Sequence, residues 1–170
     1  LYFDGTGWLK TAIQPAITAD YTVEGWFYFT NHNGAYLFGE DVTANSFVLY
    51  IHNAWNTALA TNGINNNSPH NIALNAWTHI SVVKNGALLK LYINGIEHNS
   101  VENATPNIGE MYIAAAKLAQ TGPHFNGYID DFRITKGIAR YTANFTPPIK
   151  QFANVGCEAE TVPTPSITVD

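Results

Sequence analysis

The chain has little charge and almost no sulfur. Only 12% of its 170 residues are charged, and the formal net charge is −5. Duplex DNA is bound by clustered Lys and Arg, so this balance argues against a nucleic-acid partner. Cys157 is the only cysteine, which excludes a disulfide framework within the chain. No apolar run approaches the length of a membrane span, so we expect no membrane insertion.

Uncharged polar residues take the place of charge. The chain is 46% hydrophobic and 13% aromatic, which is enough for the core of one domain of this length. Its surface is instead rich in Asn, Thr, Ser and Gly. Such a surface hydrogen-bonds neutral partners well, but it is equally typical of secreted and virion proteins that bind nothing in particular.

The hydrophobic pattern has a period of two almost throughout, which indicates β-strands. Helical signals are weak and confined to 114–120 and 137–141. Short strands separated by regular turns predict an antiparallel β-sandwich or barrel. The clearest predicted strands are Thr22–Thr30, Phe47–His52, Trp77–Lys84, Leu88–Asn94 and Met111–Ala115.

Two Asn-Gly pairs mark tight hairpins. Asn85-Gly86 predicts a type I′ turn, because both residues tolerate positive φ. Asn94-Gly95 predicts a second turn that continues the meander into Ile96–His98. The strand between the turns alternates, and we expect one side of it to face the core: Leu89, Leu91 and Ile93.

The segment Gly127–Gly137 combines strand alternation with charge. Read as uninterrupted, it places Asp131 and Arg133 on one side, and Tyr128 and Asp130 on the other. Two adjacent carboxylates on a partly buried strand need a cation, a salt bridge or a rim position.

Four segments in order give the chain a family resemblance: Tyr2–Leu9, Tyr21–Phe29, Asn75–Gly95 and Gly127–Ile134. Together they resemble the concanavalin A-like, laminin-G-like (LamG) jelly rolls over roughly residues 1 to 150. The resemblance implies an all-β antiparallel sandwich, a jelly roll, which we place at 1–152. Residues 153–170 read as a Pro/Thr-rich linker and the start of a following segment.

The resemblance also suggests a setting. The ending Ile134–Pro148 is similar to domains of phage tail-fibre and bacterial surface proteins. With the abrupt start at Leu1, it leads us to expect a piece of a longer protein on an extracellular or virion surface. Neighbouring domains of the same chain would be its partners, and a homo-oligomer is an open alternative.

Members of this superfamily often hold one structural calcium ion at the sandwich edge. By resemblance, Asp130 matches the closing-strand ligand, and Asp4 and Gly5 lie where the opening-strand ligands would be. Calcium needs six to eight oxygen ligands, to which carboxylates and carbonyls contribute. The alternative is that Asp130 or Asp131 pairs with Arg133 or caps a turn.

The sequence shows no residue spacing typical of a catalytic site or a zinc-binding site. No two of the six histidines are spaced i,i+4, and His79 is expected to be a packed or edge residue. Glycosidases of this fold carry two carboxylates on one face of a strand. Glu40 and Asp41 are adjacent and would diverge, and Glu24 stands alone. We therefore expect no enzyme activity, with a polysaccharide-cleaving enzyme as the least favoured alternative.

Sugar recognition combines aromatic faces with amide hydrogen bonds. Trp55 between Asn53 and Asn56 offers this combination, and His124 and Asn126 add to it from a second loop. Further amides occur in apparent loops at 31–33 and 65–67, although turns favour Asn without any ligand. The other tryptophans are expected in the core or at its edge: Trp8, Trp26 and Trp77.

These observations predict a non-catalytic recognition or adhesion module that binds cell-surface glycan or another host-surface receptor. The fold alone does not decide function. A structural spacer or decoration domain of a virion or surface assembly is the alternative.

Overall fold

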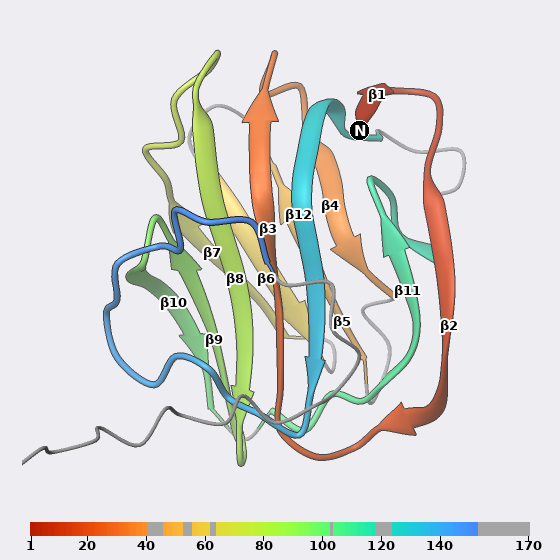
Figure 1. Cartoon of the computed structure of the whole chain (residues 1–170), viewed down its shortest axis with the longest axis vertical. Coiled ribbons are helices and arrows are strands. Elements are labelled where there is room, and N and C mark those ends of the chain that lie inside the picture. Colours follow the sequence, from red (N-terminus) through yellow and green to blue (C-terminus); the bar gives the residue numbers. More distant parts are fainter. Residues whose placement is uncertain (41–45, 53–55, 62–63, 103, 118–123, 153–170) are drawn as a thin grey trace, which may run out of the picture.

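The computed structural model describes residues 1–40, 46–52, 56–61, 64–102, 104–117 and 124–152. Two six-stranded antiparallel sheets face each other, as the sequence predicts (Figure 1). Sheet A contains, in spatial order, β1 (Tyr2–Asp4), β12 (Asn126–Lys136), β3 (Tyr21–Phe29), β8 (Trp77–Asn85), β9 (Leu88–Ile93) and β10 (Ile96–Val101). Sheet B contains β2 (Leu9–Ile17), β11 (Ile108–Ile113), β4 (Ala35–Gly39), β5 (Phe47–Ile51), β6 (Asn56–Thr61) and β7 (Ile64–Pro69).

Alternation in the strands places apolar side chains between the sheets. In β3, Val23, Phe27 and Phe29 are buried in the main core. In β9, the predicted core residues Leu89 and Leu91 are fully buried. Aromatic rings of the core pack both edge-on, as Phe27 and Phe125 do with ring centroids 5.8 Å apart, and stacked, as Phe27 and Phe38 do at 5.9 Å.

Both predicted hairpins form, but their turns differ. Between β9 and β10, Asn94 and Gly95 have φ of 50° and 78°, as a type I′ turn requires. Between β8 and β9, the central residues are Gly86 and Ala87, because Asn85 pairs with Leu88. Only Gly86 has a positive φ there, so the predicted type I′ turn is wrong and the pattern is that of type II′.

Four strands of sheet B were not among the clearest predicted ones: β2, β4, β6 and β7. β4 and β6 are short, and β7 has the sequence INNNSP, which carries little β-propensity. Residues 65–67, predicted to lie in a loop, are part of β7. Pairing with β6 along its whole length compensates for the weak local preference of this edge strand.

A β-bulge interrupts the closing strand β12. Asp130 pairs with Trp26 and Arg133 with Glu24, so two residues of β12 lie opposite Gly25 alone. Asp131 is one of the two bulged residues and has a φ of 47°, a conformation that Asp tolerates. The predicted uninterrupted alternation is therefore wrong, because the bulge brings Arg133 to the same face as Tyr128.

Residues 137–152, which we call the strap, cross the outer face of sheet A without regular structure (Figure 1). The strap is tied down by backbone hydrogen bonds from Gly137 to Asp20 and from Phe145 to Gly95. Thr22 adds two more, donating to the carbonyl of Ile138 and accepting from the amide of Arg140. No helix in the described residues is long and apolar enough to cross a bilayer.

Candidate functional site

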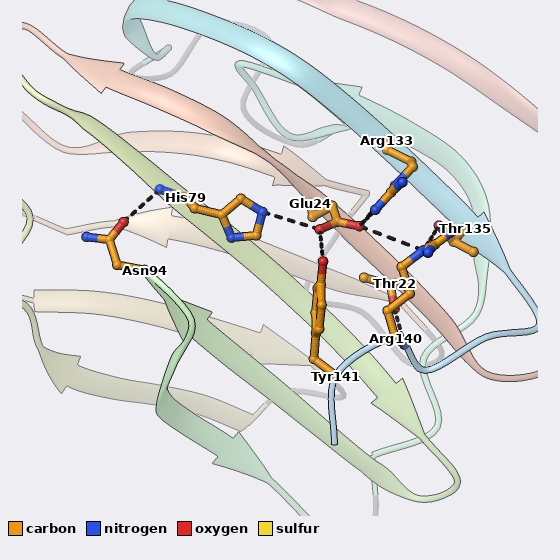
Figure 2. A network of polar contacts seen from close by, with 8 residues as sticks. All are labelled: Thr22, Glu24, His79, Asn94, Arg133, Thr135, Arg140 and Tyr141. Carbon is orange, nitrogen blue, oxygen red and sulfur yellow. Dashed lines mark hydrogen bonds and ion pairs between the residues drawn. The ribbon is translucent and has the colours of Figure 1, made fainter. Parts of the chain in front are cut away.

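A buried carboxylate lies beneath the strap, on the outer face of sheet A (Figure 2). The Glu24 side chain is fully buried. Its Oε1 accepts hydrogen bonds from Arg133 Nε at 3.0 Å and Nη2 at 2.6 Å, and its Oε2 accepts one from the Tyr141 hydroxyl at 2.8 Å. His79 Nε2 lies 3.3 Å from Oε2, within ion-pair distance but without the alignment of a hydrogen bond.

The network depends on register as much as on residue type. Glu24 faces outward from the middle of β3, and the bulge turns Arg133 of β12 toward it. The pairing of Arg133 with Asp130 or Asp131, considered as an alternative to calcium binding, is therefore wrong, because the arginine pairs with Glu24. Asp130 Oδ1 instead accepts from the amide of Asp131 at the bulge, inside β12 and not at a turn.

Burial and hydrogen bonding act in opposite directions on Glu24. Burial raises its pKa, but the contacts with His79, Arg133 and Tyr141 together outweigh burial and hold the pKa below its ordinary value of 4.5. Burial and then the Glu24 charge raise the pKa of the Tyr141 phenol well above its ordinary range. Glu24 is thus ionised and Tyr141 protonated at neutral pH.

The arrangement fits a structural role. A fully buried carboxylate whose two oxygens are both engaged cannot reach a substrate. Above it, the strap stacks Tyr141 on Phe145, with ring centroids 3.5 Å apart, and Phe145 packs edge-on against His79 and Tyr92. His79 is fully buried, which confirms it as a packed residue. Polar and aromatic contacts together fasten the strap to sheet A.

The lowered pKa of Glu24 predicts an acid-sensitive contribution to stability. A carboxyl whose pKa falls on folding stabilises the protein above its unfolded-state pKa, and this contribution is lost as pH falls through the folded-state pKa. The difference in unfolding free energy between the wild type and Glu24→Gln should be constant near neutral pH and shrink below about pH 4.5. Urea titrations from pH 7 to 3 measure it. A difference that grows on acidification would contradict the assignment.

The predicted calcium ligands do not converge. Asp4 pairs with Asn126 in the register of β1 and β12, four residues along β12 from Asp130, which corresponds to about 13 Å. Asp4 Oδ1 accepts from the amide and the hydroxyl of Thr6, and Gly5 adopts a positive φ beside Asn126. The described residues contain no group of three or more metal-binding side chains. This placement does not fit one ion shared by the three residues, and calcium stays an untested prediction.

The predicted glycan-binding residues fall on two sheets. Trp55 and Asn53 lie outside the described residues. Asn56 begins β6 and His124 forms a single bridge with Tyr36 of β4, so both belong to the sheet B side. Asn126 begins β12 in sheet A. The structure therefore brings Asn56 and His124 to one sheet and leaves Asn126 on the other.

A cross-strand row runs over the outer face of sheet B from His124. His124 pairs with Tyr36, Tyr36 with Tyr50, Tyr50 with Ala58 and Ala58 with Asn67. The rings of Tyr36 and Tyr50 are 4.6 Å apart, and His52 lies edge-on 5.4 Å from Tyr50. Asn67 is exposed, whereas Ala58 contributes only a methyl group between the rings and the amide. The five cross-strand partners are called the sheet B row: His124, Tyr36, Tyr50, Ala58 and Asn67.

The two tyrosines of this row were missed by sequence reasoning. Alternation in 47–51 could have placed Tyr50 on the outer face, because Phe47, Leu49 and Ile51 fill the core side. The expectation for Trp77 was also wrong, since it is 46% exposed on the outer face of sheet A. Trp8 and Trp26 are partly buried outside the main core, and Trp8 packs on Tyr112.

The fold is that of a lectin-like sandwich. The chain belongs to the concanavalin A-like lectin/glucanase superfamily: the Laminin_G_3 family model matches residues 3–139. No curated protein matches the chain. The family assignment therefore rests on the domain model, which covers most of the chain.

Three solved structures illustrate the shared fold. A heptameric SAP-like pentraxin from Limulus polyphemus is 22% identical, with 78% of this chain and 73% of that chain covered and a TM-score of 0.59. The fourth domain of AbnA, an extracellular arabinanase from Geobacillus stearothermophilus solved with arabinotriose, is 19% identical (80% and 69% covered; TM-score 0.61). The Ruminococcus gnavus IT-sialidase CBM40 bound to α2,3-sialyllactose is 13% identical (79% and 87%; 0.59).

Proposed function

We propose that this domain is a non-catalytic glycan-recognition module of a larger extracellular protein, such as a phage fibre or a bacterial surface protein. The observation that carries the proposal is the sheet B row, in which two adjacent tyrosine rings lie in register with an exposed amide. Sugar complexes of similarly folded domains, with arabinotriose and with sialyllactose, support it.

The sheet B row offers partners for both the apolar C–H face and the hydroxyl groups of a sugar. The rings of Tyr36 and Tyr50 offer apolar surface for the C–H face of a pyranose or furanose ring. The amide of Asn67 and the imidazole of His124 hydrogen-bond hydroxyl groups from the two ends of the row. Ala58, between them in the row, is buried and offers no surface to a ligand. Asn53, Trp55 and Asn56 would extend the site.

Tyr50→Ala tests the proposal. Wild-type protein is applied to a glycan array, and its best soluble ligand is then titrated by calorimetry against Tyr50→Ala, Trp55→Ala and Tyr50→Phe. Removing the Tyr50 ring should weaken binding by about tenfold or more, the loss of roughly one stacking contact. Tyr50→Phe keeps the ring and should retain most of the affinity.

Two outcomes would contradict the proposal. The first is a wild-type protein that binds nothing on the array. The second is the release of reducing sugar or unsaturated uronate from mixed polysaccharides, which would make the module an enzyme. Thermal unfolding of each variant checks that a loss of binding does not come from a loss of fold, because Tyr50 also supports Gly34, whose added Cβ would lie 2.6 Å from the Tyr50 hydroxyl.

A further inference from the structure

Four aromatic side chains form a second cross-strand row, on the outer face of sheet A. Tyr2 of β1 pairs with Tyr128 of β12, Tyr128 with Tyr28 of β3, and Tyr28 with Trp77 of β8. Successive ring centroids are 5.0, 5.7 and 5.6 Å apart. These four residues, which we call the aromatic row, span three interstrand spacings, or about 14 Å.

The aromatic row is exposed although the face next to it is covered. Tyr2 is 60% exposed, Trp77 46% and Tyr128 44%. The strap crosses the same face, but its rings contact His79, Tyr92 and Arg133, further along the strands. The row lies near the end of sheet A where β3 finishes and β8 and β12 begin, above the strap in Figure 1. The strap thus buries one aromatic cluster of this face and leaves the other in solvent.

Polar groups border the aromatic row on both sides. On one side, Asn126 donates to the carbonyl of Asp4 at 3.0 Å and accepts from the Thr30 hydroxyl at 2.8 Å. On the other, Asp130 is exposed in the next outward position of β12. At the Tyr2 end the row opens into a shallow hollow of about 350 Å³, which Asp4, Thr6 and Trp8 also line.

We propose that the aromatic row is a second carbohydrate-binding surface, which takes a neutral oligosaccharide laid across β1, β12, β3 and β8. The inference rests on the proposed function and adds a site and a ligand class to it. The rings supply stacking surface for successive sugars. Asn126, Thr30 and Asp130 reach the hydroxyls at the edges of the chain.

Charge selects the ligand class. Two carboxylates border the row, Asp4 at one side and Asp130 at the other, and both are exposed. Hydrogen bonds from Thr6 lower the pKa of Asp4, so this carboxylate is ionised at neutral pH. An anionic glycan would meet like charge at both borders, whereas the hydroxyls of a neutral chain would find hydrogen-bond acceptors there.

The size of the row favours a saccharide over a second copy of this chain. An aromatic side chain offers about 150–250 Å² in all, so three half-exposed rings present roughly 300 Å². A stable protein–protein interface needs about 800 Å² from each partner. The rings are also inclined to one another, 82° between Tyr28 and Tyr128, and do not make one flat apolar surface.

The test uses Tyr128→Ala, Trp77→Ala and Tyr50→Ala, the last as a matched control on the other sheet. Arabino-, xylo- and cello-oligosaccharides are titrated by calorimetry, with sialyllactose and oligogalacturonate as anionic comparators. We expect a neutral oligosaccharide to bind, and Tyr128→Ala and Trp77→Ala each to weaken it by about tenfold. Ligand should also perturb tryptophan fluorescence in the wild type and less so in Trp77→Ala.

The outcomes separate this inference from the proposed function. Binding that Tyr50→Ala weakens and Tyr128→Ala leaves unchanged would overturn the aromatic row as a site while the proposed function stands. A wild type that binds no saccharide would overturn both. A preference for the anionic glycans, abolished by Tyr128→Ala, would overturn the ligand class. A dimer in solution that Tyr128→Ala dissociates, with saccharide binding unaffected, would assign the row to self-association and overturn the inference.

Discussion

Glu24→Gln should lower the unfolding free energy by about 3 kcal/mol, because it removes one partner of a buried ion pair and leaves the other without its countercharge. The isosteric amide keeps the shape of the side chain, so the loss reports charge and hydrogen bonding rather than a cavity. Arg133, at 2.6 Å from Glu24 Oε1, loses its carboxylate, and the Tyr141 hydroxyl faces an amide in its place. Urea unfolding monitored by fluorescence and circular dichroism measures the change.

An exposed ion pair on the same sheet provides the control. Glu97 accepts from Lys90 at 2.7 Å, close to the 2.6 Å contact of the Glu24 pair, but its side chain is 37% exposed whereas that of Glu24 is fully buried. Glu97→Gln should therefore cost no more than about 1 kcal/mol. Equal losses for Glu24→Gln and Glu97→Gln would show that burial does not set the strength of the Glu24 network.

A double-mutant cycle tests whether Glu24 and Arg133 act as a unit. Arg133→Gln alone should also destabilise the protein, since it leaves the buried Glu24 carboxylate with fewer donors. The double variant should cost less than the sum of the two single variants, because neither residue is then a charge without its partner. Strict additivity would mean that the short contact contributes nothing measurable.

The local pattern of the sequence predicted the layers of this protein well. Leu89, Leu91 and Ile93 alternate with polar residues, and that period alone placed them in the core, where they are. The Asn94-Gly95 turn followed from the tolerance of both residues for positive φ. These features depend on neighbours in the sequence, which a single chain displays directly.

Features that depend on distant pairing were not predicted. Glu24 stood alone in the sequence, and nothing local connects it with Arg133, its partner across the β3–β12 register. A single inserted residue at the bulge decides which face Arg133 occupies, and a slip of one residue in a strand exchanges its two faces. The two cross-strand rows have the same origin, because Tyr2 and Tyr128 meet only when the first and last strands pair.

The strap adds a consequence for the outer face of sheet A. Tyr92 alternates with Leu91 and Ile93 and was expected on the side away from the core, yet it is fully buried. Its burial comes from the strap, through Tyr141 and Phe145. Loss of the strap would therefore expose Tyr92 together with the charged Glu24 network.

Gly95→Ala should release the strap. Gly95 sits in the β9–β10 turn with a φ of 78°, and an added Cβ would overlap the carbonyl oxygen of Phe145, a backbone atom that cannot rotate away. The same residue accepts the hydrogen bond from the Phe145 amide at 2.8 Å. We expect Gly95→Ala to lower the unfolding free energy by about 2 kcal/mol beyond the cost of the turn conformation.

Gly86→Ala isolates that cost. Gly86 occupies the β8–β9 turn with a φ of 58°, and an added Cβ there would meet nothing within 4 Å. Gly86→Ala should therefore lower the unfolding free energy only by the cost of holding alanine at a positive φ, about 1–2 kcal/mol. Limited trypsin digestion then locates the difference: cleavage after Arg140, in the strap, should accelerate in Gly95→Ala and not in Gly86→Ala. If both variants lose equal stability and digest at equal rates, Gly95 does not hold the strap, and the contact with Phe145 is incidental to the fold.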